Sequence, residues 1–330
     1  MIYAYPEKLE KFKAMSTVLD VVQFLSVRVK ELDQLLINPP YYTFEIPKKS
    51  GGVRTITAPE EALKKVQQTI LKQVEELYHK PSSVYGFVAM DESEEYACPI
   101  VANAANHINK HYVLTVDIHH FFESIKTQDV FQLFTNEPFY FPEKIALILT
   151  RLTTYKGYLP TGAPTSPMLS NLIFRDIDQK LEDLANKIGF TYSRYADDLT
   201  FSSNEPFPVE FLEQIEKCIQ PFTLNTKKTR IKKQSQQQKV TGILVNEKVN
   251  IDRKWIKQLR AMLHDLKING VRKASFNHFK KANQESFFIH RLRGNIAFLG
   301  QVRGICDKEY NKYQFEFDQL VIKNRVIRPK

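Results

Sequence analysis

Three aspartates carry the chemistry that this sequence suggests most directly. Asp197 and Asp198 are adjacent in "YADDLTF", a run of strand formers, and Asp117 ends the apolar run "YVLTV". A lone Asp at a strand end is usually a turn former or a helix cap. The pair is harder to explain as an ordinary turn, because "YADDLTF" has no Gly, Pro or Asn at its centre. A tight hairpin with both carboxylates at its apex is the remaining structural option, and their repulsion needs a cation.

Mg²⁺ meets that need, because it takes carboxylate oxygens and keeps waters and substrate phosphates in its other positions. Two such ions about 3.5–4 Å apart clamp the attacking and leaving oxygens of a phosphoryl transfer. Three carboxylates at two neighbouring strand ends can hold both ions. The sequence therefore predicts a two-magnesium site at Asp117, Asp197 and Asp198.

The elements that must position these residues can be read from hydrophobic periodicity and turn residues. The chain reads as helical up to Leu36, and a hairpin with a basic turn follows at Lys48–Gly52. A strand ends at Asp117, and the "YADD" strand comes later. Helices are predicted at 60–78, 127–155 and 209–218, and after the proline-glycine loop "LPTGAPTSP". A further hairpin is predicted with its turn near Asn246-Glu247, and the chain reads as helical and basic from Asp252.

The composition is that of an ordinary globular protein, with 43% hydrophobic and 25% charged residues in a chain of 330. The three cysteines have no paired spacing, which favours a reducing cytoplasm over a disulfide framework or a cysteine zinc site. No apolar run approaches the roughly 18 residues of a membrane span, and the N-terminus lacks a secretion signal's apolar core. We therefore expect a cytoplasmic protein with no membrane partner.

Positive charge is concentrated in the last third of the chain. Residues 1–220 hold 22 Lys and Arg against 29 Asp and Glu, a net charge of −7. Residues 221–330 hold 25 against 8, a net charge of +17. Scattered lysines are often only a solvated surface, but a block of this size favours a polyanion, most often a nucleic acid.

These residues together resemble reverse transcriptases. "VDIHHFF", "LPTGAPTSP", "LSN", "YADD", "NTKKT" and "VTG" occur in the order of the palm motifs of that family. "GGVRTITAP" and the helix after it resemble the family's fingers segment. "NAANH" at 103–107 and "VTG" at 240–242 are similar to the two hallmarks of retron reverse transcriptases. The resemblance runs from about Pro47 to Gly304.

The resemblance implies a role for each matching residue of the catalytic centre. Asp117, Asp197 and Asp198 would bind two Mg²⁺ ions, with the backbone carbonyl of Ile118 completing the site. Phe122 would select deoxynucleotides (dNTP substrates) by its bulk beside the sugar, and Phe121 would pack in the core. Lys228 of "NTKKT" resembles the lysine that protonates the departing pyrophosphate. Its neighbour Lys227 is a near-equal candidate.

Further residues would contact the incoming nucleotide. Arg54 resembles the fingers residue that grips the triphosphate, with Lys48 and Lys49 as helpers or as a solvated turn. Gly162 would let the backbone approach the nucleotide and template closely. Thr161 stands where the family usually has glutamine, so it offers one short hydroxyl instead of an amide.

The hallmarks and the basic C-terminal third imply contacts with RNA. The resemblance suggests RNA-binding roles for Asn103 and His107, with His107 either buried or touching RNA, and for Val240, Thr241 and Gly242. His107 and His111 are spaced for zinc, but no third ligand accompanies them. Basic residues interleaved with aromatics from 251 onward would line a duplex or a structured RNA, which proteins recognise mainly through shape, phosphates and 2′-hydroxyls. The candidates in that region are Lys254, Arg260, Arg291 and Arg293.

We therefore expect an α+β right-hand polymerase. Its parts would be an N-terminal helical segment (1–40), fingers (41–112), a palm with an antiparallel sheet (113–245, with part of the fingers at about 127–157) and a helical RNA-binding thumb (246–330). The resemblance implies a retron enzyme that copies part of its cognate msr-msd noncoding RNA into branched msDNA. Synthesis would start from a guanosine 2′-OH and serve antiphage defence beside a separate effector protein. The alternatives are another defence-associated or diversity-generating reverse transcriptase, and an inactive polymerase-like RNA-binding scaffold.

Overall fold

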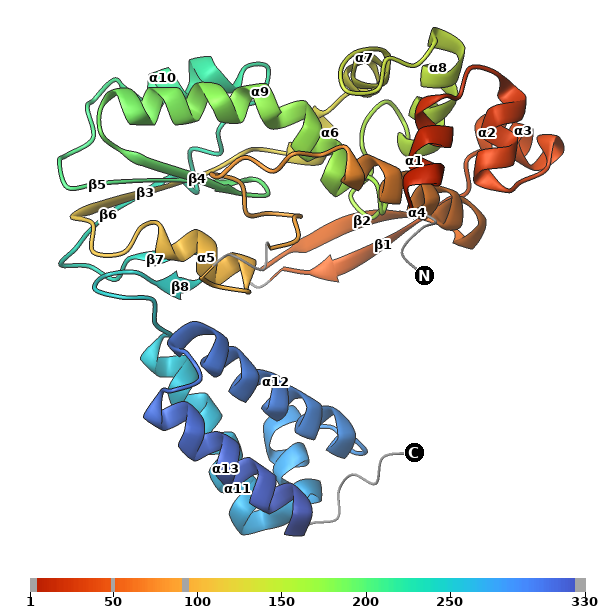
Figure 1. Cartoon of the computed structure of the whole chain (residues 1–330). Helices are drawn as coiled ribbons and strands as arrows, with labels where there is room; N and C mark the ends of the chain where they lie inside the picture. The colour runs from red at the N-terminus through yellow and green to blue at the C-terminus, as the bar shows by residue number, and fades with distance from the viewer. Residues whose placement is uncertain (1–4, 49–50, 91–94, 324–330) are drawn as a thin grey trace. The chain divides into compact units, whose positions relative to one another are not determined.

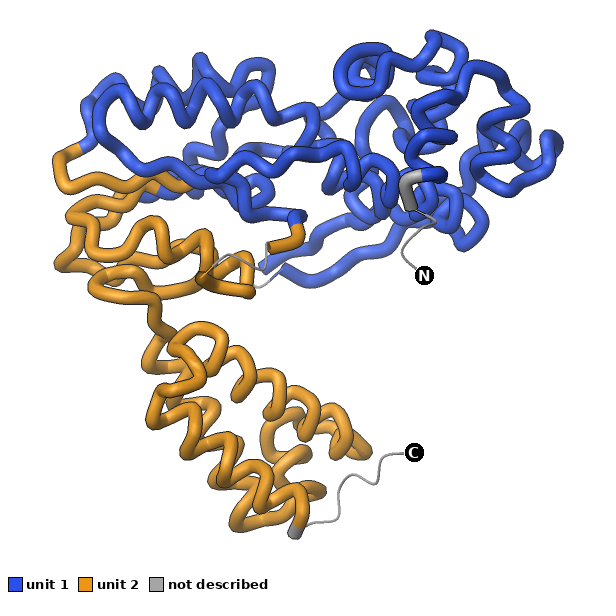
Figure 2. The backbone as a smooth tube through the Cα atoms, in the orientation of Figure 1, with its two compact units in different colours: residues 1–88, 115–199, 207–230 blue, residues 89–114, 200–206, 231–330 orange. Residues whose placement is uncertain are grey.

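The structure, a computed structural model, describes residues 5–48, 51–90 and 95–323, so Lys49 lies outside the described residues. The chain forms two compact units (Figure 2). Unit 1 comprises residues 1–88, 115–199 and 207–230, and unit 2 comprises 89–114, 200–206 and 231–330. Unit 2 thus combines the C-terminal helices with segments from earlier in the chain.

The N-terminal segment contains three short helices instead of a continuous helical run. They are α1 (Tyr5–Lys13), α2 (Val18–Leu25) and α3 (Val29–Ile37). Thr17 begins α2 with a capping box, in which its hydroxyl accepts from Asp20 N–H and Asp20 accepts from Thr17 N–H. Ser26 ends α2 in the left-handed conformation, with φ 54°. The apolar periodicity continues through this segment, but the caps at Thr17 and Ser26 divide it into separate helices.

A hairpin and a helix follow in unit 1. Strands β1 (Tyr41–Pro47) and β2 (Val53–Pro59) pair antiparallel, with Phe44 opposite Ile56 and Ile46 opposite Arg54. Helix α4 (Glu61–Glu76) buries the apolar face predicted for it, including Leu63 and Ile70. The predicted hairpin is thus confirmed in its two strands, and residues 49–50 of its turn lie outside the described residues.

The predicted catalytic strands belong to one four-stranded sheet with the order β4-β5-β3-β6. Its strands are β3 (Tyr112–Asp117), β4 (Thr191–Tyr195), β5 (Asp198–Ser203) and β6 (Arg230–Lys233). Only two residues join β4 to β5, which requires an antiparallel hairpin. Helices α9 (Ser166–Lys187) and α10 (Phe211–Ile219) cover one face of this sheet (Figure 1).

The helix predicted over 127–155 is two helices, and that expectation was wrong. Helix α7 (Thr127–Thr135) ends before Pro138, and α8 (Glu143–Thr153) begins after Pro142. Proline lacks the N–H that a continuing helix needs, so the two prolines interrupt it. The short helix α6 (Phe121–Ser124) precedes α7 and follows the strand that ends at Asp117.

Unit 2 has its own hydrophobic core, built from α5 (Pro99–Ala105), strands β7 (Lys239–Val240) and β8 (Ile243–Leu244) and three long helices. These helices are α11 (Arg253–Phe279), α12 (Glu285–Arg303) and α13 (Lys308–Lys323). Gly270 kinks α11 with a non-helical φ of 70°. The β7–β8 hairpin turns at Thr241-Gly242, both with positive φ. A second reversal follows between Leu244 and Asn250, near Asn246-Glu247, where the sequence predicted a turn.

No helix in the described part of the chain combines the length and the apolar character that a membrane span needs.

Candidate active site at two strand ends of unit 1

The three aspartates lie at two adjoining chain reversals of unit 1. Asp117 ends β3, Asp197 lies in the turn between β4 and β5, and Asp198 begins β5. The N–H of Ile118 donates to the backbone carbonyl of Asp197 at 3.0 Å. That bond holds the end of β3 against the aspartate turn although the two aspartates are 80 positions apart in the sequence.

Asp117 is largely buried and fully engaged by one segment, residues 225–228. The Asn225 amide donates to Asp117 Oδ2 at 3.1 Å, and Asn225 N–H donates to the Asp117 carbonyl at 2.7 Å. Lys228 Nζ contacts Asp117 Oδ1 at 2.5 Å. The exposed Lys227 makes no such contact, so Lys228 is the lysine of "NTKKT" that faces the aspartates. Asn225 was not predicted as a site residue. The signal that could have identified it is its place as the first residue of "NTKKT".

Negative charge at the turn is poorly compensated. Desolvation and then the charge of Asp117 raise the pKa of Asp197. Desolvation, followed by the charges of Asp197 and Asp117, raises the pKa of Asp198 to about 6. The Asp198 side chain stays open to water, which limits the energetic cost of its charge. Lys228 acts in the opposite direction on both groups, and Arg54 on Asp197.

The donor set suits hard divalent cations, although the side chains do not already form a metal cage. Within residues 5–48, 51–90 and 95–323, no three His, Cys, Asp or Glu side chains converge as a metal site. The Lys228 ammonium contacts Asp117 Oδ1, so one oxygen of this carboxylate is already engaged in an ion pair. Clustered carboxylates with destabilised charge, open to solvent at Asp198, fit a hard divalent cation. Among the same described residues, no third His, Cys, Asp or Glu joins His107 and His111 to form a zinc site.

The two phenylalanines after Asp117 face different environments. Phe121 is buried against Phe174 and Phe222, with ring centroids 5.7 and 5.9 Å away. Phe122 is only partly buried and lies 6.0 Å from the ring of Phe87. Phe122 is therefore the ring available to a substrate.

The loop with Thr161 and Gly162 is attached to β2. The Thr161 hydroxyl accepts from Thr57 N–H at 3.1 Å, and Gly162 N–H donates to the Thr57 carbonyl at 2.9 Å. A Cβ at Gly162 would lie 2.8 Å from that carbonyl and 2.9 Å from Ile56 Cγ2. The close approach that requires glycine here is thus to the strand that carries Arg54, and the hydroxyl of Thr161 is already bonded. Arg54 and Lys48 are exposed.

The retron-like hallmarks pack together inside unit 2. Asn103 and His107 are fully buried, and the ring of His107 is 2.7 Å from Ser202 Oγ. Burial, and then the charge of Lys110, lowers the pKa of His107 to about 3, so the ring is neutral at physiological pH. The Thr241 hydroxyl donates to the carbonyl of Ile100 on α5 at 2.7 Å.

This packing corrects part of the RNA-binding prediction. The side chains of Asn103, His107 and Val240 have no exposed surface, so they present no group to RNA. Thr241 is partly buried, and Gly242 provides the left-handed turn position with φ 85°. The expectation that His107 is either buried or touching RNA resolves to the buried alternative.

The other RNA-binding candidates are exposed cations on the helices of unit 2. Lys254 is exposed in the first turn of α11. The guanidinium of Arg291 lies 5.7 Å from the ring centre of Phe279, and that of Arg293 lies 5.8 Å from that of Phe317. Arg260 is bonded to Tyr313 and Glu309, so part of its charge is already compensated.

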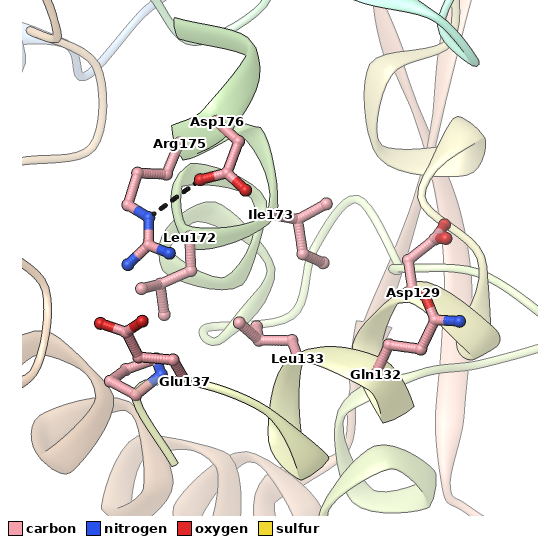
Figure 3. Close-up of a pocket in the computed structure, with 9 residues that line it drawn as sticks. Asp129, Gln132, Leu133, Glu137, Leu172, Ile173, Arg175 and Asp176 are labelled. Atoms are coloured by element: carbon pink, nitrogen blue, oxygen red, sulfur yellow. Dashed lines mark hydrogen bonds and ion pairs between the residues drawn. The ribbon is translucent and has the colours of Figure 1, made fainter. Parts of the chain in front are cut away.

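A side pocket of unit 1 shares no residue with the aspartate site. It has a volume of about 260 Å³ and lies between α7 and α9, where Arg175 and Asp176 form an ion pair at 3.3 Å (Figure 3). Helix α9 contributes Leu172, Ile173, Arg175 and Asp176 to its wall.

Comparison with known proteins agrees with the site. A family model described as reverse transcriptase (RNA-dependent DNA polymerase) matches residues 46–245. The retron Ec86 reverse transcriptase of Escherichia coli is 33% identical over 325 residues, which cover 96% of this chain and 94% of that protein. The retron Mx65 reverse transcriptase of Myxococcus xanthus is 33% identical over 74% of this chain, which spans only 62% of that relative.

Among solved structures, a telomerase from Candida albicans in complex with a telomeric RNA fragment aligns with 86% of this chain and 63% of its own, with 10% identity and a TM-score of 0.45. That likeness is too distant to bear on function. The family match and the near full-length similarity to the Escherichia coli enzyme do bear on it. This chain belongs to the retron reverse transcriptases, a family of RNA-directed DNA polymerases.

Proposed function

We propose that this reverse transcriptase copies part of a cognate structured noncoding RNA, an msr-msd transcript, into msDNA. Synthesis starts from the 2′-OH of an internal guanosine, so the DNA is branched from its RNA template. The proposal extends to this chain the class of protein that its similar relatives are named for.

The observation that carries the proposal is the junction of the two aspartate segments. The bond from Ile118 N–H to the Asp197 carbonyl brings the Asp117 strand end to the Asp197-Asp198 turn. Three acidic side chains then share one edge, with Lys228 and Arg54 as the nearby cations that act on them. Such an arrangement suits a substrate that brings its own negative phosphates and bound metal.

Each residue has a proposed part in nucleotide addition. Asp117, Asp197, Asp198 and the carbonyl of Ile118 would hold two Mg²⁺ ions, which neutralise charge that develops on the phosphate oxygens. Arg54 binds the triphosphate of the dNTP, and Thr161 and Gly162 fix the loop beside it. The attacking hydroxyl gives its proton to water and its oxygen forms the new bond to the α-phosphorus. The bond to pyrophosphate breaks, and Lys228 donates a proton to that leaving group.

Phe122 selects the sugar in this proposal, because its partly exposed ring follows Asp117 and a 2′-hydroxyl would clash with it. Replacing Phe122 by Val should admit ribonucleotides while dNTP incorporation persists. Incorporation of both nucleotide types from a single mixture measures the ratio. An unchanged ratio would remove Phe122 from sugar selection.

Exposed cations of unit 2 provide the RNA-binding surface. Lys254, Arg291 and Arg293 lie on α11 and α12, and the two arginines lie near aromatic rings. Phosphate contacts from such side chains supply sequence-independent affinity. Recognition of a structured RNA then adds shape and 2′-hydroxyl contacts.

The cellular role belongs to the same proposal. The enzyme works in the cytoplasm as part of an antiphage system with a separate effector protein. Its three cysteines are free thiols, which agrees with a reducing compartment.

The test is the nucleic acid that co-purifies with the protein. We expect RNA and DNA joined in one molecule, which a debranching enzyme separates into a linear RNA and a linear DNA. The matched control is the protein with Asp197→Asn and Asp198→Asn, which should retain RNA without attached DNA. DNA that is unaffected by debranching, or the absence of DNA from the active protein, would overturn the branched-product proposal.

A further inference from the structure

Arg194 is the largest fully buried side chain that the structure describes in this chain. Its Nε and Nη2 atoms donate to the two carboxylate oxygens of Asp178 on α9, both at 2.7 Å. The Tyr192 hydroxyl donates to the same carboxylate at 2.8 Å. Burying two charges is costly even when they are paired, and apolar residues of similar size often give equal stability. A buried ion pair in this place therefore calls for a reason beyond stability.

The remaining nitrogen of Arg194 reaches the aspartate turn. Its Nη1 atom donates to the carbonyl of Ala196 at 3.1 Å and to Asn171 Oδ1 at 3.0 Å. Ala196 immediately precedes Asp197 and has a left-handed φ of 58°. A residue with a Cβ adopts that conformation only where its surroundings hold it. The guanidinium thus fixes the peptide group that joins Ala196 to Asp197.

The opposite side of the turn is held by Gly86. The Asn171 amide, whose oxygen accepts from Arg194, donates to the Gly86 carbonyl at 3.0 Å. Gly86 is so close to the turn that a Cβ there would lie 2.1 Å from Ala196 N. The segment before Gly86 is bonded to β4 at Arg194. Arg194 N–H donates to the Ser83 carbonyl, and Tyr85 N–H donates to the Arg194 carbonyl. The turn is therefore enclosed between the guanidinium and the Gly86 backbone.

The spacing on α9 explains why one helix can supply the partners. Asn171, Phe174 and Asp178 follow a spacing of three and four residues, so they lie on one face. Phe174 completes the set, with the Arg194 guanidinium 4.8 Å from its ring centre. The residues between them, Leu172, Ile173, Arg175 and Asp176, line the side pocket on another face (Figure 3). Arg175 and Asp176 therefore form an exposed ion pair on the same helix that does not touch the turn.

We propose that Arg194, oriented by Asp178 and Asn171, is a positioning residue that holds the Ala196–Asp197 peptide and so places the catalytic carboxylates. The inference rests on the proposed catalytic role of Asp197 and Asp198. The buried pair holds the turn in place, and Arg194 itself touches neither nucleotide nor metal.

The decisive variant replaces both charges at once, Arg194→Met with Asp178→Leu, so that no unpaired charge remains buried. If the pair positions the turn, the variant folds and binds RNA, yet its kcat for dNTP incorporation falls by roughly 100-fold, as expected for a misplaced catalytic group. The KM for dNTP changes much less. Mn²⁺ binding followed by electron paramagnetic resonance should weaken too, which gives a readout independent of turnover.

Two further variants sharpen the test. Arg194→Lys keeps the positive charge, but a single ammonium cannot reach Asp178, Asn171 and Ala196 with the geometry of a guanidinium. It should be folded and share the loss of kcat, and it decides the matter if the double variant does not fold. The control is Arg175→Met with Asp176→Asn, the exposed pair on α9, which should leave kcat and Mn²⁺ binding unchanged.

The outcomes separate this inference from the proposed function. Wild-type kcat and Mn²⁺ binding in a folded double variant, or in Arg194→Lys, would overturn the positioning role. The variant Asp197→Asn is assayed in parallel. If Asp197→Asn also keeps full activity, the assignment of the catalytic aspartates fails, and the positioning role falls with it.

Discussion

Asp117 is bonded to Lys228 and Asn225, so these are the two side chains of "NTKKT" that contact the proposed site. In the proposed mechanism, Lys228 would leave Asp117 when metal and nucleotide bind, and its ammonium would then lie beside the substrate phosphates. A proton donor in that position assists the leaving group, and general acids of this kind contribute about 10²–10⁴-fold to rate.

The adjacent lysines give a matched test of this role. Replacing Lys228 by Met should lower kcat for dNTP incorporation by roughly 100-fold. Replacing the exposed Lys227 by Met should leave kcat within a factor of a few. Single-nucleotide incorporation under saturating dNTP measures both. Equal losses in the two variants would contradict the assignment of Lys228 to the leaving group.

The raised pKa of Asp198 leads to a prediction about stability and pH. Its folded pKa of about 6 exceeds the ordinary value of 3.8, so the folded state binds more protons between these values. Stability contributed by this residue therefore falls as pH rises from about 4 to about 6. Without divalent ions, Asp198→Asn should be more stable than the wild type at pH 7–8, by no more than about 1 kcal/mol because water screens the exposed group.

Denaturant unfolding in EDTA at several pH values measures this difference. The advantage of Asp198→Asn should vanish near pH 4 and shrink when Mg²⁺ is added at pH 7.5. A variant that is less stable than the wild type at pH 7.5 in EDTA would show that the carboxylate is not repelled by its neighbours.

At the scale of elements, the loop at Thr161-Gly162 joins the palm to the β1–β2 hairpin within unit 1. Gly162 approaches β2 more closely than any side chain allows. Replacing Gly162 by Ala should displace the loop from β2, lower stability and raise the KM for dNTP, because Arg54 lies on the same strand. Steady-state kinetics and thermal unfolding measure the two effects.

Gly294 provides the control for that substitution. It lies within α12, and a Cβ there would meet nothing within 4 Å. Gly294→Ala should therefore be neutral or stabilising by up to about 1 kcal/mol, since alanine favours a helix. A Gly162→Ala protein that behaves like Gly294→Ala would contradict the close contact with β2.

The elements that the sequence predicted well are those with strong local signals. The strand that ends at Asp117 and the hairpin at "YADD" have apolar runs bounded by charged residues, and both are present. The 127–155 helix failed because its apolar periodicity continues past Pro138 and Pro142. The turn predicted near Asn246-Glu247 is present, but the β7–β8 turn was missed because Thr241 adopts a positive φ that threonine rarely has. The Arg194–Asp178 pair was missed because its partners lie 16 positions apart on different elements.

At the scale of the whole molecule, charge is divided along the chain, with a net of −7 in residues 1–220 and +17 in 221–330. The sequence located this basic block and its helices. It could not show that segment 89–114 joins them in unit 2, because that association depends on long-range packing of α5 with β7 and β8. The same packing buries Asn103 and His107, whereas the cations of unit 2 remain exposed.

The exposed cations of unit 2 should set the salt dependence of RNA binding. Changing Lys254, Arg291 and Arg293 to Gln should weaken binding and reduce the slope of log K against log salt by roughly one unit for each phosphate that the protein no longer neutralises. The control changes Lys8, Lys11 and Lys65 of unit 1 to Gln. An unaltered slope in the unit 2 variant would show that these cations face solvent in the complex, and an equal reduction in the control would show that the effect is not specific to unit 2.

The central claim is that Asp117, Asp197 and Asp198 together perform RNA-templated DNA synthesis. The most direct measurement is extension of a primer on an RNA template with dNTPs and Mg²⁺, comparing the wild type with Asp197→Asn/Asp198→Asn and with Asp176→Asn, an exposed aspartate of α9. We predict extension by the wild type and by Asp176→Asn, and none by the double variant, although all three bind RNA equally. Extension by a folded double variant would contradict the account.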